Sequence, residues 1–199
     1  IKTFAQLLGD RYDDDGFRAR FQEVVGSDIE RMDDLLEAMV EFADFAAPRG
    51  AAVVLGEKLR SVVEDVGGVF AKRQTRINWT GNGGTCAIRA DDAQLTYILK
   101  NVLLAVLAQA KMGSEIEIEL TGNGSVVVSY MREGARLASI THYLSETSGE
   151  SNESLLPLRL LLAKQLVERN GGRLVMDQSD NEREIVRMEF PIGQHGNNN

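Results

Sequence analysis

Few residues in this chain of 199 could carry out chemistry, and most of them lack partners at a useful spacing. The chain has two histidines, His142 and His195, and one cysteine, Cys86. A single cysteine excludes an internal disulfide and a cysteine-rich zinc site, so we expect a buried apolar thiol in a reducing compartment. The acids at 13–15 could suggest a cation site. Because no further ligand follows at EF-hand spacing, we interpret them as a solvated loop.

Composition and charge narrow the classes of function further. The chain is 43% hydrophobic and 26% charged, which is typical of a globular protein, and its net charge is −8. The negative charge argues against nucleic acid or an anionic membrane surface as the main partner, and against Trp79 and the tyrosines as a base-stacking platform. No apolar run reaches the roughly 18 residues of a membrane helix. We therefore expect a cytoplasmic protein, with an anchor upstream of Ile1 left open.

The elements that would position any site fall into two regions. Residues 1–47 carry helical spacing only, in a short arm at 1–9 and a long helix at 17–47. Apolar residues of the long helix follow steps of four and three, which indicates a seam that packs against other helices. That seam consists of Val25, Ile29, Met32, Leu36 and Met39. We expect a helical hairpin whose first arm is cut short.

The second region, 50–192, alternates between helices and strands after the break at 48–50. We expect helices at 55–73, 93–111 and 155–170, and strands near 77–79, 85–89, 115–121, 125–131, 173–178 and 184–191. The last helix should bury Leu155, Leu158, Leu161, Leu162 and Leu166. The tail, 193–199, is expected to be disordered. The fold class is α+β: a helical hairpin followed by a two-layer α/β sandwich, with helices on one face of a mixed sheet.

This order of elements, and several strings, resemble a sensor histidine kinase of the nitrogen-regulation type. The strings are IKTFAQLL (1–8), AQLTYILKNVLLAVLAQA (93–110), LVERNGGRLVM (166–176) and EIVRMEFPI (184–192). The resemblance implies that 1–47 is part of the dimerisation and histidine-phosphotransfer hairpin. It implies that 50–192 is a catalytic ATP-binding domain of the GHKL or Bergerat type. The phosphoacceptor histidine would lie about two helical turns before Ile1, and His142 lacks the residues that flank it in the family.

The nucleotide motifs of that family are degenerate here. The metal-binding asparagine of the N box corresponds to Ala105, whose methyl group cannot coordinate Mg²⁺. We expect Asn101, one turn earlier, to be a structural hydrogen-bonding residue. In the first glycine box, Tyr130 replaces the aspartate that reads adenine and Arg132 replaces a glycine, while Gly134 remains.

The second glycine box has lost all its glycines. Its positions hold the string LLPLRL at 155–160, in which Pro157 has no N–H to donate to a phosphate and Arg159 brings a large side chain. Since metal, base and phosphate positions are all altered, we expect a pseudokinase without bound ATP or Mg²⁺ and without catalytic residues. Whether the chain is an enzyme stays open. The alternative is an atypical, active ATP-dependent histidine kinase whose phosphoacceptor lies upstream.

The function that follows is a two-component signal transduction module that acts through dimerisation and through receiver docking or phosphotransfer; a passive scaffold is a further possibility. The seam predicts a homodimer, weakened by the truncated first arm. Apolar residues at the hairpin tip predict a docking surface for a response-regulator receiver domain, with packing of the tip itself as an equal alternative. These residues are Phe4, Leu8, Phe17, Phe21 and Val24.

Overall fold

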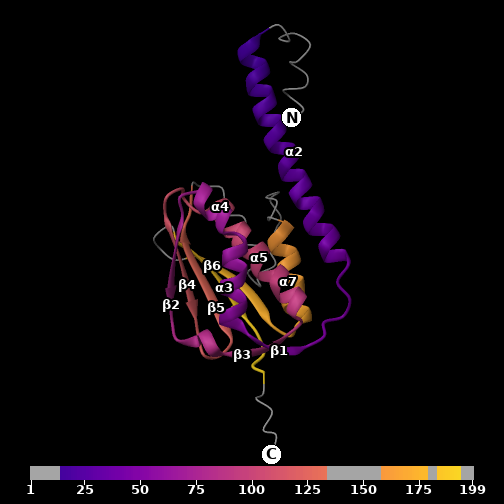
Figure 1. The fold of residues 1–199 in the computed structure, drawn as a ribbon, viewed down its shortest axis with the longest axis vertical. Coiled ribbons are helices and arrows are strands. Elements are labelled where there is room, and N and C mark those ends of the chain that lie inside the picture. Colours follow the sequence, from indigo (N-terminus) through magenta and orange to yellow (C-terminus); the bar gives the residue numbers. More distant parts are fainter. Residues whose placement is uncertain (1–13, 134–157, 179–182, 194–199) are drawn as a thin grey trace, which may run out of the picture. The chain divides into compact units, whose positions relative to one another are not determined.

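The computed structural model describes residues 14–133, 158–178 and 183–193 (Figure 1). The chain forms two compact units, Ile1–Asp44 and Phe45–Asn199. The domain limits expected from the sequence, 1–47 and 50–192, stay predictions. The expected first arm at 1–9 and the tail beyond Gly193 lie outside the described residues.

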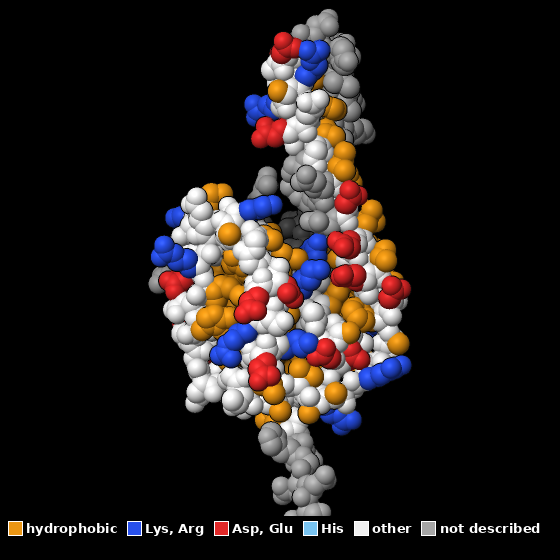
Figure 2. Space-filling view, viewed as in Figure 1, with side chains coloured by type: hydrophobic (Ala, Val, Ile, Leu, Met, Phe, Trp, Pro, Cys, Tyr) orange, Lys and Arg blue, Asp and Glu red, His pale blue; other side chains and the backbone are white. Residues whose placement is uncertain are grey.

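The described part of the first unit is one long helix, α2 (Asp15–Ala43). It begins where the Asp14 side chain accepts a hydrogen bond of 3.1 Å from the backbone N–H of Phe17, as an N-cap does. Four residues of the predicted seam keep about half of their surface exposed: Ile29 (48%), Met32 (48%), Leu36 (58%) and Met39 (47%). Figure 2 shows apolar side chains along this helix with acidic side chains beside them. Among the described helices, none is long and apolar enough to cross a membrane.

The second unit is built on a five-stranded sheet in the order β2-β4-β5-β7-β6. Strand β2 (Arg76–Thr80) runs parallel to β4 (Glu115–Leu120), and the other pairs are antiparallel. The remaining strands are β5 (Ser125–Met131), β6 (Arg173–Gln178) and β7 (Arg183–Glu189). The β4–β5 hairpin turns through Gly124, whose φ of 80° suits glycine. The predicted mixed sheet is confirmed.

Two features near the start of this unit differ from the expectation. A small second sheet pairs β1 (Ala51–Val54) with β3 (Ala87–Ala90), which follows the short 3₁₀ turn η1 (Gly83–Thr85). Strand β1 was not predicted, because four small apolar residues give no periodic signal. The single helix expected at 55–73 is two helices, α3 (Leu55–Asp65) and α4 (Gly67–Lys72), because the chain breaks at Val66 before two glycines of low helix propensity.

Helices α3, α5 (Asp92–Gln109) and α7 (Leu158–Arg169) cover one face of the large sheet (Figure 1). Alternate strand residues point toward them, as the two-residue period of a strand requires. Those on β4 and β5 are at most 3% exposed: Ile116, Ile118, Leu120, Val126, Val128 and Tyr130. The predicted α+β sandwich is confirmed.

The buried face of α7 differs from the predicted one. Its buried residues are Leu160, Ala163, Leu166 and Val167, whereas Leu161 is 38% exposed. Leu158 and Leu162 are half-buried, and Leu155 lies outside the described residues. The helix has more leucines than one face can bury, so the pattern alone does not fix its rotation. Arg159 shares a face with Ala163 one turn later, and it bonds to α5.

Candidate functional site

The positions that the resemblance assigns to the nucleotide motifs gather around α5, where the structure describes them. Asn101 and Ala105 lie on this helix, and both are at most 2% exposed. The start of α7 reaches Asn101 through Arg159, and the end of β5 reaches Gln109 of α5 through Tyr130. Gly134 and Pro157 lie outside the described residues. The structure therefore brings residues of all three expected nucleotide motifs to one helix, α5.

Asn101 is fully buried and both ends of its amide are occupied. Its Nδ2 donates to the backbone oxygen of Tyr97 at 2.9 Å, and its Oδ1 accepts from Arg159 Nη1 at 2.6 Å. The second bond is charge-assisted and short, which places it among the stronger hydrogen bonds of proteins. The two bonds support the structural role expected for Asn101, which stays a prediction. Its amide oxygen, one helical turn from Ala105, is thus occupied by the guanidinium group of Arg159.

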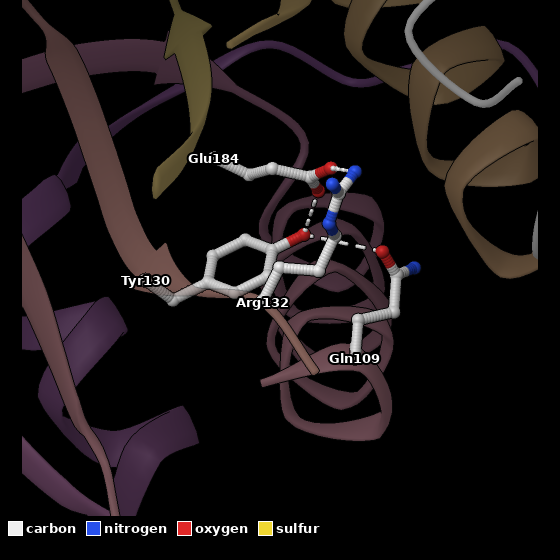
Figure 3. A network of polar contacts seen from close by, with 4 residues as sticks. All are labelled: Gln109, Tyr130, Arg132 and Glu184. Carbon is white, nitrogen blue, oxygen red and sulfur yellow. Dashed lines mark hydrogen bonds and ion pairs between the residues drawn. The ribbon is translucent and has the colours of Figure 1, made fainter. Parts of the chain in front are cut away.

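Tyr130 is the centre of a second buried cluster (Figure 3). Its hydroxyl donates to Glu184 Oε2 at 2.6 Å and lies 3.2 Å from Gln109 Oε1. Arg132 Nη1 lies 3.3 Å from the other carboxylate oxygen of Glu184. Tyr130 and Glu184 are direct partners in the β5–β7 register, so both side chains stand on the helix-covered face of the sheet.

The electrostatics of this cluster indicate side chains that are bonded to one another, not a reactive group. Glu184 is 1% exposed, and a buried carboxylate is tolerated only when it is paired and hydrogen-bonded. Each of its oxygens has a partner, one in Tyr130 and one in Arg132. Burial, together with the charge and hydrogen bond of Glu184, raises the pKa of Tyr130 well above its ordinary value. The phenol therefore stays protonated and serves as a donor, not as a nucleophile.

Sequence reasoning missed Glu184 and Gln109. A signal for Glu184 exists in the strand string EIVRMEF, where it has the same parity as Val186 and Met188 and so falls on the buried face. An acid among apolar residues of one parity indicates a buried carboxylate that needs a partner. Gln109 gave no signal, because the last turn of a helix often carries a polar residue.

A third polar cluster lies at the other end of α5, where the sequence predicts Asp91 or Asp92 as the cap of the helix but gives no sign of the partners Gln94 and Asn170. The Asp91 carboxylate caps α5 by accepting from Gln94 N at 3.1 Å, and it accepts from the backbone N–H of Arg49 at 2.9 Å. These bonds, the one from Arg49 first, hold the pKa of Asp91 below its ordinary value. Asn170, just after α7, donates to Gln94 Oε1 at 2.9 Å and accepts from Asp91 N at 2.8 Å.

The residues predicted for partner contacts lie on α2 where they are described. Phe17, Phe21 and Val24 are half-buried, and the rings of Phe17 and Phe21 lie 6.3 Å apart between centroids. Phe4 and Leu8 lie outside the described residues, as do both histidines. Within the described ranges, no group of three or more His, Cys, Asp or Glu side chains is placed to hold a metal ion.

Solved structures of histidine kinases share this fold. The histidine kinase ThkA, in a crystal structure of its complex with the response regulator protein TrrA, matches 96% of this chain and 56% of its own at 16% identity, with a TM-score of 0.66. The cytoplasmic segment of histidine kinase QseC matches 83% of this chain and 95% of its own at 13% identity, with a TM-score of 0.58. The Acinetobacter baumannii histidine kinase AdeS matches 96% of both chains at 11% identity, with a TM-score of 0.54.

No family model matches the chain, and no curated protein matches its sequence. At identities this low, the likeness to the solved structures establishes the fold. The chain has the fold of a histidine-kinase core, as the sequence analysis expected.

Proposed function

We propose that this chain is a two-component signalling module that does not bind ATP in the manner of histidine kinases and acts in the cytoplasm through protein contacts. The observation that carries the proposal is the pair of closed polar clusters on α5. The Asn101–Arg159 bond lies one helical turn from the degenerate metal position, Ala105, and joins it to the degenerate phosphate position, while Tyr130 bonds to Glu184 at the degenerate adenine position.

Binding of a nucleotide would have to break these contacts. An adenine amino group needs a free acceptor, but both oxygens of Glu184 already accept bonds from this chain. A magnesium ion needs oxygen ligands, and the oxygen of Asn101 lies 2.6 Å from a guanidinium nitrogen. Each displaced group would then be left buried without a partner, at a cost of about 1–3 kcal/mol. This cost supports a pocket that is filled by its own side chains.

The partners proposed are a second copy of the chain and a response-regulator receiver domain. The exposed apolar residues of α2 support the dimer, because each fully buried residue of this kind contributes about 1.5–3 kcal/mol. The ThkA structure is a complex with a response regulator, and this supports a receiver as the second partner. Phosphotransfer would additionally need a histidine upstream of Ile1.

Titration calorimetry with Mg-ATP tests the proposal on the full chain. We expect no binding heat at millimolar nucleotide, and the same result for Ala105→Asn, because restoring one metal ligand leaves Arg159 and Tyr130 in place. A 1:1 isotherm with micromolar affinity for the natural chain would refute the proposal and support the atypical active kinase. An isotherm for Ala105→Asn alone would show that the polar clusters do not close the pocket.

A further inference from the structure

The segment 45–49, which follows the end of α2, belongs to the second unit. Its sequence, FAAPR, is unlike the glycine- and serine-rich composition of a flexible linker, and its proline restricts the backbone. Three of its five residues contact α5 or the residue that caps it. The segment therefore has the composition and the contacts of a fixed element.

The three contacts differ in kind. The ring of Phe45 meets the ring of Tyr97 edge-on, with 5.3 Å between centroids and an interplanar angle of 80°, an arrangement that aromatic pairs prefer. The backbone oxygen of Ala46 accepts from Gln94 Nε2 at 2.9 Å. The backbone N–H of Arg49 donates to Asp91 Oδ2 at 2.9 Å.

The partners of the segment are themselves held in place. Tyr97 is 4% exposed and Gln94 is 2% exposed. Asn170, which is 9% exposed, bonds to Gln94, to Asp91 and to the backbone oxygen of Leu166 in α7. A displacement of the segment would thus have to break its contacts to α5 residues that are themselves held by Asn170 at the end of α7.

We propose that residues 45–49 form a rigid joint, a segment of the second unit that is held to the Asp91–Gln94–Asn170 network between α5 and α7. The joint rests on the proposed signalling function only for its purpose, since a segment fixed to α5 and α7 is where this unit would receive a signal along the chain.

Limited proteolysis of the full chain tests the joint. Arg49 and Gly50 are exposed, but trypsin needs an unrestrained backbone around the bond it cuts, so we expect slow cleavage at Arg49–Gly50 while the segment is bonded to α5. The informative variant is Asp91→Asn. Asparagine caps a helix as well as aspartate does, so the bond to Gln94 N is retained. The Nδ2 of the new asparagine would take the place of Oδ2 and face the Arg49 N–H, so two hydrogen-bond donors would point at each other. Gln94→Ala removes the bond to Ala46 and also the acceptor of Asn170 Nδ2.

We expect each variant to speed cleavage at Arg49–Gly50 about tenfold, since cleavage follows the population of the open segment and one hydrogen bond that holds the segment is lost. The matched control is Asp92→Asn, because Asp92 is the next residue, is 63% exposed and pairs with Lys58. It should leave the rate unchanged. Cleavage at Arg187–Met188, within β7, reports general unfolding in the same digest.

Two outcomes would overturn the joint. The first is equal cleavage at Arg49–Gly50 in the natural chain and in both variants, which would show that the segment is already open. The second is an equal acceleration at Arg49–Gly50 and at Arg187–Met188, which would assign the network to the stability of the whole unit. Circular dichroism at the digestion temperature identifies any variant that fails to fold. If one variant fails, the test rests on the other variant, through the ratio of its cleavage rate at Arg49–Gly50 to its rate at Arg187–Met188.

Discussion

Replacing Tyr130 by phenylalanine removes one oxygen from the core and tests whether the Tyr130–Glu184 bond holds β5, β7 and α5 together. Both side chains are 1% exposed, so water cannot replace the lost hydroxyl. The bond is 2.6 Å long and its acceptor is a carboxylate. Hydrogen bonds to charged groups contribute about 1.5–3 kcal/mol, and we expect the free energy of unfolding to fall by that amount. Phenylalanine fills nearly the same space, so no cavity adds to the cost.

Urea unfolding followed by circular dichroism measures the change, and a matched double-mutant cycle isolates the bond. Glu184→Leu alone should destabilise the chain, because it leaves Arg132 and the tyrosine hydroxyl without their acceptor. The double variant should be more stable than the sum of the two single changes predicts, since replacing both partners removes the buried polar groups together. A change below about 0.5 kcal/mol for Tyr130→Phe, with no coupling in the cycle, would refute the reasoning.

The same pair of proteins gives a pH test with a defined sign. Tyrosine in the unfolded chain ionises near pH 10, whereas burial and the Glu184 carboxylate keep Tyr130 protonated in the fold at higher pH. Above about pH 10 the unfolded state binds fewer protons, so stability falls as pH rises, by up to about 1.4 kcal/mol per pH unit. Tyr130→Phe lacks this loss. Its stability deficit should therefore shrink between pH 9 and 11, and parallel curves would contradict the assigned shift.

Three further predictions concern the other contacts. Leu36→Glu should abolish dimerisation in sedimentation experiments, because it puts a charge in the exposed apolar face of α2; an unchanged mass would remove that face from the interface. Arg159→Leu should lower stability by about 1–3 kcal/mol in urea, since it leaves the buried oxygen of Asn101 without its Arg159 donor, while Gln165→Leu, at an exposed position of the same helix, serves as the control. Phe21→Ala should weaken receiver binding by about 1–2 kcal/mol, roughly 5- to 30-fold, with the fold intact by circular dichroism; a loss of fold would instead support packing of the tip.

The sequence predicted the fold well because its signals are local. Apolar spacing located α2, α5 and most strands, and turn residues such as Gly124 located the hairpins. Strand β1 and the break at Val66 escaped because short segments carry little periodicity. The rotation of α7 escaped because several leucine stripes were equally apolar, and the structure buries the stripe with Leu160, Ala163 and Leu166.

For the candidate site, the sequence predicted only the absence of the usual nucleotide-binding groups. Comparison with the family motifs predicts that Ala105 and Tyr130 do not bind metal or adenine in the usual way, and this stays a prediction. What Tyr130 bonds to depends on the register between strands, because Glu184 lies 54 residues further along the chain. The Arg159–Asn101 bond spans 58 residues in the same way. Pairings at such separations follow from the tertiary structure and leave no pattern in the local sequence.

Under the proposed function, these long-range bonds also explain how the fold persists when the nucleotide motifs have changed. A bound ligand stabilises the folded state by mass action, and a domain that no longer binds one loses that contribution. Here Arg159 joins α7 to α5, and Tyr130 with Glu184 joins α5 to two strands. The chain's own side chains thus bridge elements that surround the degenerate positions. A substitution in either bridge should therefore lower the free energy of unfolding even without nucleotide. In a pocket not filled by these side chains, the same substitution would leave that free energy unchanged.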